Sequence, residues 1–104
     1  MFHVLVALAE TDRHGYAILK AVHERTGGQV DLSTGTLYTM IKRLLADGIV
    51  VESRRRPAAA QDDQRRKYYR LTDFGRQVLS AETARLQSMV AAARAIGALK
   101  KASS

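Results

Sequence analysis

The chain of 104 residues contains no cysteine and no tryptophan, and these absences exclude several classes of site. Without cysteine the protein has neither a disulfide framework nor a thiolate ligand for a metal, so we expect an intracellular protein. Without tryptophan an indole-lined stacking pocket is excluded, although a cavity lined by Ala, Met and Leu is not.

Long hydrophobic runs are also missing. No segment approaches the ~20 apolar residues that span a bilayer. The first ten residues, MFHVLVALAE, include neither a basic leader nor a small-residue cleavage site. With 46% apolar residues the chain can form one compact domain with a modest core. We therefore expect a soluble, cytoplasmic protein that does not span a membrane.

Patterns that carry catalysis or hold metals are absent as well. His3, His14 and His23 form no i, i+4 pair on a helix, and His14 stands where a helix cap is expected. There is no nucleophile motif, phosphate-cradling glycine loop or nominated carboxylate pair. We predict no enzymatic activity, no cofactor and no metal site. An enzyme built on the histidines is a rival hypothesis, which a metal assay would test.

What the chain has in excess is positive charge, and its distribution is uneven. Residues 1–50 carry five Lys or Arg and five Asp or Glu, whereas 51–70 carry seven against three and 71–104 five against two. The net charge of +7 therefore arises after residue 50. Such a balance predicts attraction to a polyanion, either nucleic acid or an anionic membrane surface.

Periodicity predicts three short helices in the first half, over residues 2–9, 15–25 and 34–47. Gly27 and Gly28 end the second helix, and Ser33 stands at the N-cap of the third. The third helix is expected to bury one stripe and to expose the opposite one. The buried stripe comprises Leu37, Ile41, Leu44 and Leu45, and the exposed one Gly35, Thr39, Lys42, Arg43 and Ala46.

After Gly48 the pattern changes to strand. IVVESRR (49–55) and RKYYRL (66–71) are predicted to pair as an antiparallel hairpin whose tip, PAAAQDDQ (57–64), is expected to be mobile. Tyr68 and Tyr69 alternate, so we expect one of them to pack inward. The arginines at 54–56 fit phosphate contact, or a charged guard on an edge strand.

From Thr72 a helix of roughly 25 residues is predicted, ~37 Å long and longer than the small domain. Its apolar residues follow a heptad-like seam that predicts pairing with a second copy; folding back on its own domain is the alternative. We expect residues 1–72 to form one domain and 73–104 a dimerisation helix with a basic tail. The dimerisation residues are Leu79, Leu86, Met89, Val90, Ala93 and Ile96.

Three helices followed by a hairpin is the order of a winged helix-turn-helix, so the predicted fold is mainly α with a small β-hairpin and a long C-terminal helix. The exposed face of the third helix is small and polar at Gly35, Thr36 and Thr39 and basic at Lys42 and Arg43. A helix that enters the major groove needs such a face, because its backbone must approach the bases. We therefore expect a homodimeric regulator of double-stranded DNA, with residues 1–72 as its DNA-binding domain and with no membrane partner.

Three blocks, HGYAILK (14–20), LSTGTLYTMIKRLLADGIVV (32–51) and RRKYYRLTDFGRQVL (65–79), resemble the PadR family of bacterial transcriptional regulators in order and spacing. The resemblance implies a winged-helix dimer, typically a repressor of a pseudo-palindromic operator that a small apolar or phenolic effector releases. It places Gly35, Thr36, Tyr38 and Lys42 on the recognition helix. The wing is the predicted hairpin of residues 49–71. Further DNA contacts are expected from Tyr16 and from the wing residues Arg54, Arg55, Arg65, Arg66 and Lys67.

The chain departs from the family pattern where proline usually follows Ser33 and Tyr38, because it has Thr34 and Thr39 there. Base preferences are therefore not carried over from the family. Tyr38 fits two interpretations, a phosphate contact or a cover at the edge of the core. A winged-helix module that binds an acidic protein and never reads DNA is the alternative function.

Overall fold

The computed structural model describes residues 1–54 and 66–97. Within these ranges the chain forms four helices and three short strands in the order α1, β1, α2, α3, β2, β3 and α4. The helices are α1 (Phe2–Glu10), α2 (Gly15–Arg25), α3 (Thr34–Ala46) and α4 (Asp73–Ala95), and the strands are β1 (Arg13–His14), β2 (Val50–Ser53) and β3 (Tyr68–Leu71).

The predicted elements are present, with one addition. The sheet has three antiparallel strands in the order β1-β3-β2, so the expected hairpin of β2 and β3 is extended by β1. Arg13 pairs with Tyr69 and His14 with Tyr68. A two-residue strand is too short to show a period of two, which is why the sequence pattern did not reveal it.

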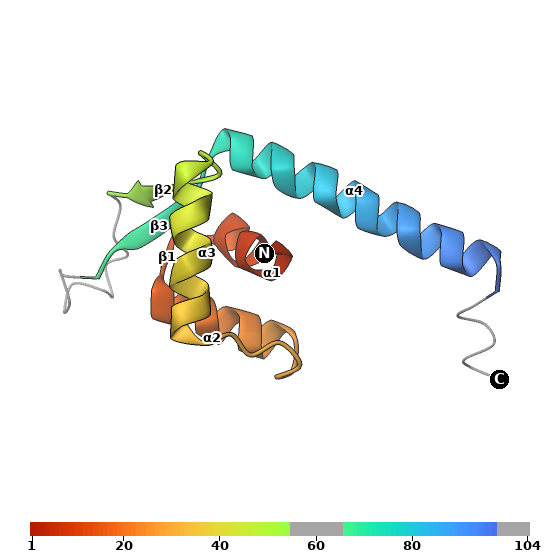
Figure 1. Cartoon of the computed structure of the whole chain (residues 1–104), viewed down its shortest axis with the longest axis horizontal. Coiled ribbons are helices and arrows are strands. Elements are labelled where there is room, and N and C mark those ends of the chain that lie inside the picture. Colours follow the sequence, from red (N-terminus) through yellow and green to blue (C-terminus); the bar gives the residue numbers. More distant parts are fainter. Residues whose placement is uncertain (55–65, 98–104) are drawn as a thin grey trace.

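The core lies where α1, α2, α3 and the sheet meet, with α1 in contact with α2, α4 and β3 (Figure 1). Its largest fully buried side chains are aliphatic. They are Val4, Leu5, Leu8, Ile18, Val22, Leu37, Ile41, Leu44 and Val50. On α1, α2 and α3 these residues are spaced three or four positions apart, so each helix has one apolar face. The three faces pack together in one core.

Two expectations about burial were wrong. Leu45 is 39% exposed, because it lies at the edge of the apolar stripe in the last turn of α3. Tyr68 and Tyr69 are both buried, at 3% and 5% exposure. Tyr69 belongs to the core, whereas the ring of Tyr68 is covered by the ring of His14, whose centroid lies 5.2 Å away in an edge-to-face arrangement. The unexpected strand β1 brings His14 there.

The connection between the domain and α4 is held by side-chain hydrogen bonds and by close backbone packing. Thr72 Oγ1 accepts a hydrogen bond from the Gly75 N–H (2.9 Å) and lies 2.7 Å from the Gly48 carbonyl oxygen, to which it donates. A side chain at Gly75 would overlap the Ile49 carbonyl oxygen, so the first turn of α4 packs directly on the backbone that leads into β2. From this join α4 runs past α1 and beyond the domain (Figure 1).

Candidate nucleic-acid interface

The start of α3 is set by Ser33, as the cap pattern predicted. Its Oγ accepts a hydrogen bond from the Thr36 N–H (3.1 Å) and donates one to Thr36 Oγ1 (2.9 Å). This cap fixes where the first turn of the helix begins. Leu37, Ile41 and Leu44 then face the core.

The opposite face of α3 is open to solvent. The five residues expected there to meet DNA are all exposed: Gly35, Thr36, Thr39, Lys42 and Arg43. Arg43 approaches Asp47 at 3.9 Å, which is a weak exposed pair. Lys42 has no ion-pair partner within residues 1–54 and 66–97, so its ammonium group is available to an outside anion.

Gly35 differs from every other glycine in the described ranges. Gly27, Gly28, Gly48 and Gly97 have positive φ, which favours glycine, and Gly15 and Gly75 have no room for a side chain. Gly35 has neither reason, because a Cβ built there meets nothing within 4 Å. Glycine inside a helix costs about 1 kcal/mol relative to alanine. No contact and no backbone angle within the described residues requires glycine at this position.

Tyr38 is placed by Gly15. The Tyr38 ring lies over the start of α2, where its Cζ would stand 2.8 Å from a Cβ at Gly15. The side chain is nevertheless 47% exposed. Tyr38 therefore both covers the junction of α2 with α3 and leaves part of its ring at the surface beside the exposed face of α3.

The first turn of α2 carries Tyr16, which is 65% exposed. His14 caps this helix, since its Nδ1 accepts a hydrogen bond from the Ala17 N–H at 3.1 Å. The His14 and Tyr16 rings stack with centroids 6.4 Å apart. The cap predicted for His14 is thus present, and it sets the direction in which α2 presents Tyr16.

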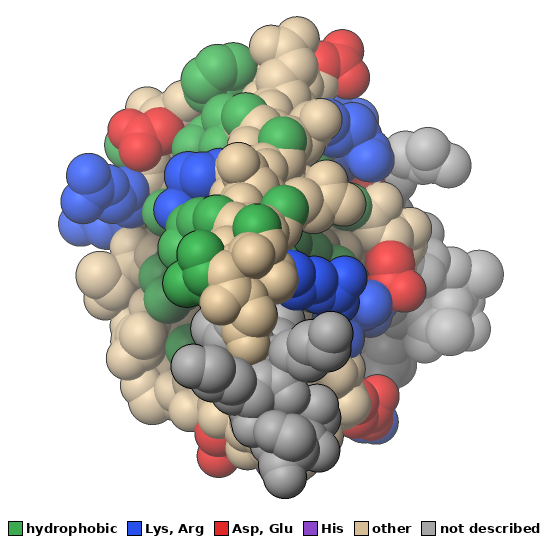
Figure 2. Space-filling view, turned by 90° about the vertical axis from the view of Figure 1, so that its right-hand side faces the viewer, with side chains coloured by type: hydrophobic (Ala, Val, Ile, Leu, Met, Phe, Trp, Pro, Cys, Tyr) green, Lys and Arg blue, Asp and Glu red, His purple; other side chains and the backbone are tan. Residues whose placement is uncertain are grey.

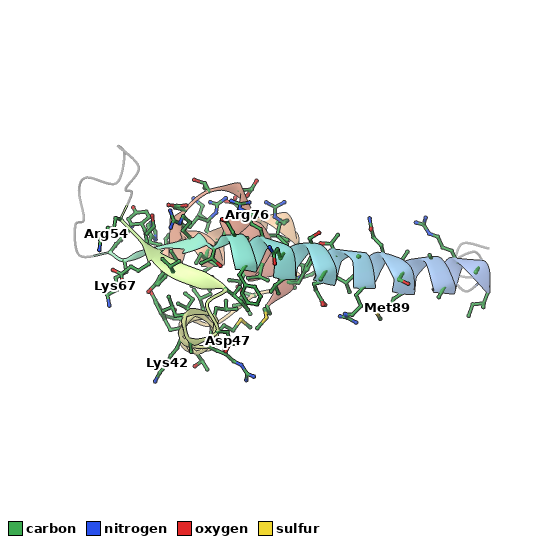
Figure 3. All side chains as sticks on the ribbon, turned by 90° about the horizontal axis from the view of Figure 1, so that it is seen from above. Lys42, Asp47, Arg54, Lys67, Arg76 and Met89 are labelled. Atoms are coloured by element: carbon green, nitrogen blue, oxygen red, sulfur yellow. The ribbon has the colours of Figure 1, made fainter. Side chains whose placement is uncertain are left out.

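The wing contributes cations from both of its strands. Arg54 follows β2, and Arg66 and Lys67 precede β3; all three are exposed. In Figure 3, Lys42 and Lys67 project toward the same corner of the molecule, with Arg54 beside Lys67, whereas Arg76 of α4 lies on the side away from Lys42. Arg55 and Arg65, and the predicted tip 57–64, fall outside the described residues.

The wing is also tied to the rest of the domain. Ser53 Oγ donates to Asp12 Oδ2 at 2.5 Å, which joins the end of β2 to the turn before β1. An Arg66 guanidinium nitrogen lies 3.1 Å from His14 Nε2. The wing, β1 and the beginning of α2 are therefore linked through side chains as well as through the sheet.

Carboxylates elsewhere have altered acidity. Hydrogen bonds from Arg25 and Arg13 lower the pKa of Glu10 below its usual value, and a hydrogen bond from Arg85 lowers the pKa of Glu82. Burial raises the pKa of the Tyr69 phenol. The two carboxylates are thus paired with arginines outside α3, and neither is paired with Lys42 or Arg43.

The residues predicted for dimerisation lie in three settings along α4. Leu79 packs against the core of its own domain. Leu86 and Val90 line a hollow of about 650 Å³ together with Phe2 and Arg94. Met89 and Ile96 are 56% and 80% exposed, and Ala93 is half-buried. Figure 2, which looks toward the far end of α4, shows hydrophobic side chains gathered over the middle of this face.

The histidines are not brought together. His14 caps α2, His23 approaches Asp31 at 3.6 Å, and His3 lies beside Phe2. Within residues 1–54 and 66–97, no three His, Asp or Glu side chains are grouped so that they could hold a metal ion. In the same ranges no helix combines the length and the apolar character needed to cross a membrane.

Comparison with known proteins bears on what this surface does. Residues 4–81 match the model of the transcriptional regulator PadR-like family. A crystal structure of a PadR family transcription regulator from Clostridium difficile is 26% identical, covers 91% of this chain and 96% of its own, and superposes with a TM-score of 0.70.

Two further structures share the fold. Bacillus subtilis PadR in complex with operator DNA is 23% identical, with a TM-score of 0.65 over 79% of this chain and 45% of that one. F93 from STIV, a winged-helix DNA-binding protein, is 22% identical, with a TM-score of 0.69 over 86% and 88%. The predicted winged helix with a long C-terminal helix is therefore confirmed.

The relatives are transcriptional regulators and not enzymes, as the sequence predicted. The matched range begins in α1 and ends within α4, so it includes the helices, the strands and the exposed face of α3. The chain belongs to the PadR-like family of transcriptional regulators.

Proposed function

We propose that this regulator is a cytoplasmic, homodimeric repressor that reads a pseudo-palindromic operator in double-stranded DNA. In this proposal residues 1–72 read the DNA and residues 73–104 hold two copies together. Each copy inserts α3 into a major groove, so that the two recognition helices enter successive grooves ~34–36 Å apart. Repression follows because the bound dimer occludes the promoter.

The observation that carries the proposal is the bare, exposed glycine at position 35, in the first turn of a capped helix. The bases lie at the floor of a groove that is only just wide enough for one helix. A missing side chain on the outer face of the first turn shortens the distance between helix and base edges. Thr36, Thr39 and Lys42 continue that face with groups that can meet bases and phosphates.

The remaining candidate contacts surround α3. Tyr16, Tyr38 and Arg43 flank it, and the wing supplies Arg54, Arg66 and Lys67 together with Arg55 and Arg65 from outside the described ranges. In this proposal the wing cations follow the phosphate backbone next to the groove. Each phosphate they neutralise releases counterions, so affinity falls as salt rises. The B. subtilis PadR complex with operator DNA supports this use of the fold.

The effector is the second part of the proposal. The hollow lined by Phe2, Leu86 and Val90 has a volume of about 650 Å³, within the range of pockets that hold small molecules. A small apolar or phenolic molecule bound between α4 and the domain would favour a dimer geometry that no longer fits the operator. Thermal-shift screening should identify a stabilising compound that also lowers affinity for the operator.

The decisive experiment replaces Gly35 with alanine, because the proposal predicts changes of opposite sign. The Gly35→Ala protein should be more stable by about 0.5–1 kcal/mol, since alanine is the better helix former and its Cβ meets no neighbour. Its affinity for DNA selected from random duplexes should fall at least tenfold. Urea unfolding and gel shifts over a salt series measure the two quantities.

Ala46→Gly serves as the control, because it exchanges the same two amino acids in the opposite direction, at the other end of the exposed face of α3. It should lower stability and leave specific affinity nearly unchanged. A Gly35→Ala protein that binds selected DNA as tightly as the wild type would contradict the proposed docking of α3. A protein that enriches no sequence at all would instead favour the module that binds an acidic protein.

A further inference from the structure

The two threonines on the outer face of α3 have different hydrogen-bonding states. Thr39 Oγ1 donates to the carbonyl oxygen of Gly35, one turn earlier, at 3.0 Å. The single hydroxyl proton of Thr39 is therefore used within the helix. The other arm of its branched β-carbon, the methyl group, occupies a different staggered position. Thr39 is exposed, so its side chain can offer an outside partner this methyl group or the lone pairs of its oxygen, but not a hydroxyl proton.

Thr36 presents the opposite chemistry. Its Oγ1 accepts a hydrogen bond from Ser33 Oγ at 2.9 Å, so the Thr36 hydroxyl proton is not consumed by that contact and can be donated outward. Thr36 and Thr39 are three positions apart and so lie on one side of the helix. The outer face of α3 therefore offers a hydroxyl donor in its first turn and a methyl group in the next.

Gly35 places this pair close to whatever α3 approaches. It supplies the carbonyl oxygen that holds the Thr39 hydroxyl, and it leaves open space beside that carbonyl. A duplex seated against Gly35 would meet the Thr39 methyl group one turn further along. In the major groove the edges of guanine, adenine and cytosine present polar groups, and thymine alone adds a C5-methyl group.

We propose that Thr39 is a specificity-determining residue that recognises thymine by contact of its methyl group with the thymine C5-methyl. This inference rests on the proposed docking of α3 in the major groove. Beyond that docking, thymine is the base that Thr39 recognises, and the Thr39 methyl group is the part that makes the contact. The hydroxyl of Thr39 has a positioning role, because its bond to Gly35 fixes which way the methyl group turns.

The experiment uses the full chain and deoxyuridine, which differs from thymidine only by lacking that C5-methyl group. Sequences bound by the wild type are first selected from random duplexes, and each thymine of the selected site is then replaced singly by uracil. At one thymine in each half-site the replacement should lower wild-type affinity about fourfold, the value of about one buried methyl group. Gel shifts at constant salt give the affinities.

Two variants separate the methyl group from the hydroxyl. Thr39→Ser keeps the hydroxyl and removes the methyl group, so it should bind thymine and uracil sites alike. Thr39→Val keeps methyl groups and removes the hydroxyl, so it should still prefer thymine. Thr36→Ser, which removes a methyl group three positions earlier, is the matched control and should keep the preference of the wild type.

The inference is overturned if no uracil replacement affects the wild type, or if Thr39→Ser still distinguishes the two bases. It is also overturned if Thr39→Val binds thymine and uracil sites alike, because a side chain with methyl groups and no hydroxyl would then fail to recognise thymine. In each of these cases specific binding by the wild type leaves the proposed function intact. A wild type that selects no duplex overturns both.

Discussion

The winged-helix domain and the far half of α4 differ in how much of their apolar side chains is exposed to solvent. In the domain, Leu5, Ile18 and Leu44 are at most 1% exposed, and the core they form belongs to one chain. Along α4, Met89, Val90 and Ile96 are between 46% and 80% exposed. The domain buries its apolar residues by itself, whereas the far half of α4 leaves them exposed.

The largest expected effect comes from placing a charge on the exposed seam. Val90→Lys should raise the dissociation constant of the proposed dimer about 100-fold or more. The interface would then contain two unpaired ammonium groups, one from each copy, near Arg94. Lysine is the better helix former, so the monomer should stay folded. Sedimentation equilibrium measures the dissociation constant.

Ser88→Lys adds the same charge to the same helix at an exposed position that does not line the hollow with Phe2. It should leave the dimer nearly unchanged. If both variants dissociate equally, net charge controls association. The exposed apolar residues of α4 would then have no special role in it.

The next effect concerns the place where the two regions join. Gly75→Ala should lower the free energy of unfolding by about 2–3 kcal/mol, because its Cβ would overlap the Ile49 carbonyl oxygen and stand 2.8 Å from Leu71 Cδ1. Backbone cannot move aside as a flexible side chain can. Urea unfolding checks the value, and Gly35→Ala, with open space around it, should show the opposite sign.

A smaller loss is expected from the cap at the same join. Thr72→Ala removes the acceptor for the Gly75 N–H and the donor to Gly48, which should cost about 1–2 kcal/mol. Thr72→Ser keeps both hydrogen bonds and should lose much less. Equal losses in the two variants would show that the methyl group, not the hydroxyl, anchors α4 to the domain.

The smallest effect separates ion pairs that join elements from those within one helix. Glu10 pairs with Arg13 of β1 and Arg25 of α2, whereas within the described residues Glu82 pairs only with Arg85 of its own helix. Both carboxyls have a lowered pKa, so their stabilisation is present above about 4.5 and is lost as pH falls through the folded pKa. Melting temperatures between pH 6 and 3 should therefore fall less steeply for Glu10→Gln than for the wild type.

Glu82→Gln should change that pH profile less, because its partner lies three residues away and remains a neighbour after local unfolding. Both effects are small, since exposed ion pairs contribute little. A steeper profile for Glu10→Gln would contradict the sign of its pKa shift.

Much of the fold followed from periodicity and caps, because those signals are local. Ser33 and Thr72 were placed correctly at helix starts, and both cap hydrogen bonds are present. Strand β1 was missed because it is defined by its partner β3 and by no pattern of its own. The burial of Tyr68 depends on that strand through His14, so the error at Tyr68 followed from the missing strand.

The candidate interface was predictable in composition but not in detail. The small, polar and basic residues on one face of α3 are visible from spacing alone. That Tyr38 packs on Gly15, and that Thr39 bonds back to Gly35, are contacts between side chain and backbone that no periodicity encodes. The residues from His14 to Tyr16 mark the start of a helix in the sequence. Only the fold places the His14 side chain beside Arg66 of the wing.

The length of α4 has a mechanical consequence. Its 23 residues form a rod of roughly 35 Å that is fixed to the domain at Thr72 and Gly75. A pivot of roughly 10° at the far end of such a rod would swing α3 by about 6 Å, close to two base-pair steps. In the proposed dimer, a slight adjustment at the contact between the two α4 helices would therefore be amplified, and it would move the two copies of α3 out of register with successive major grooves.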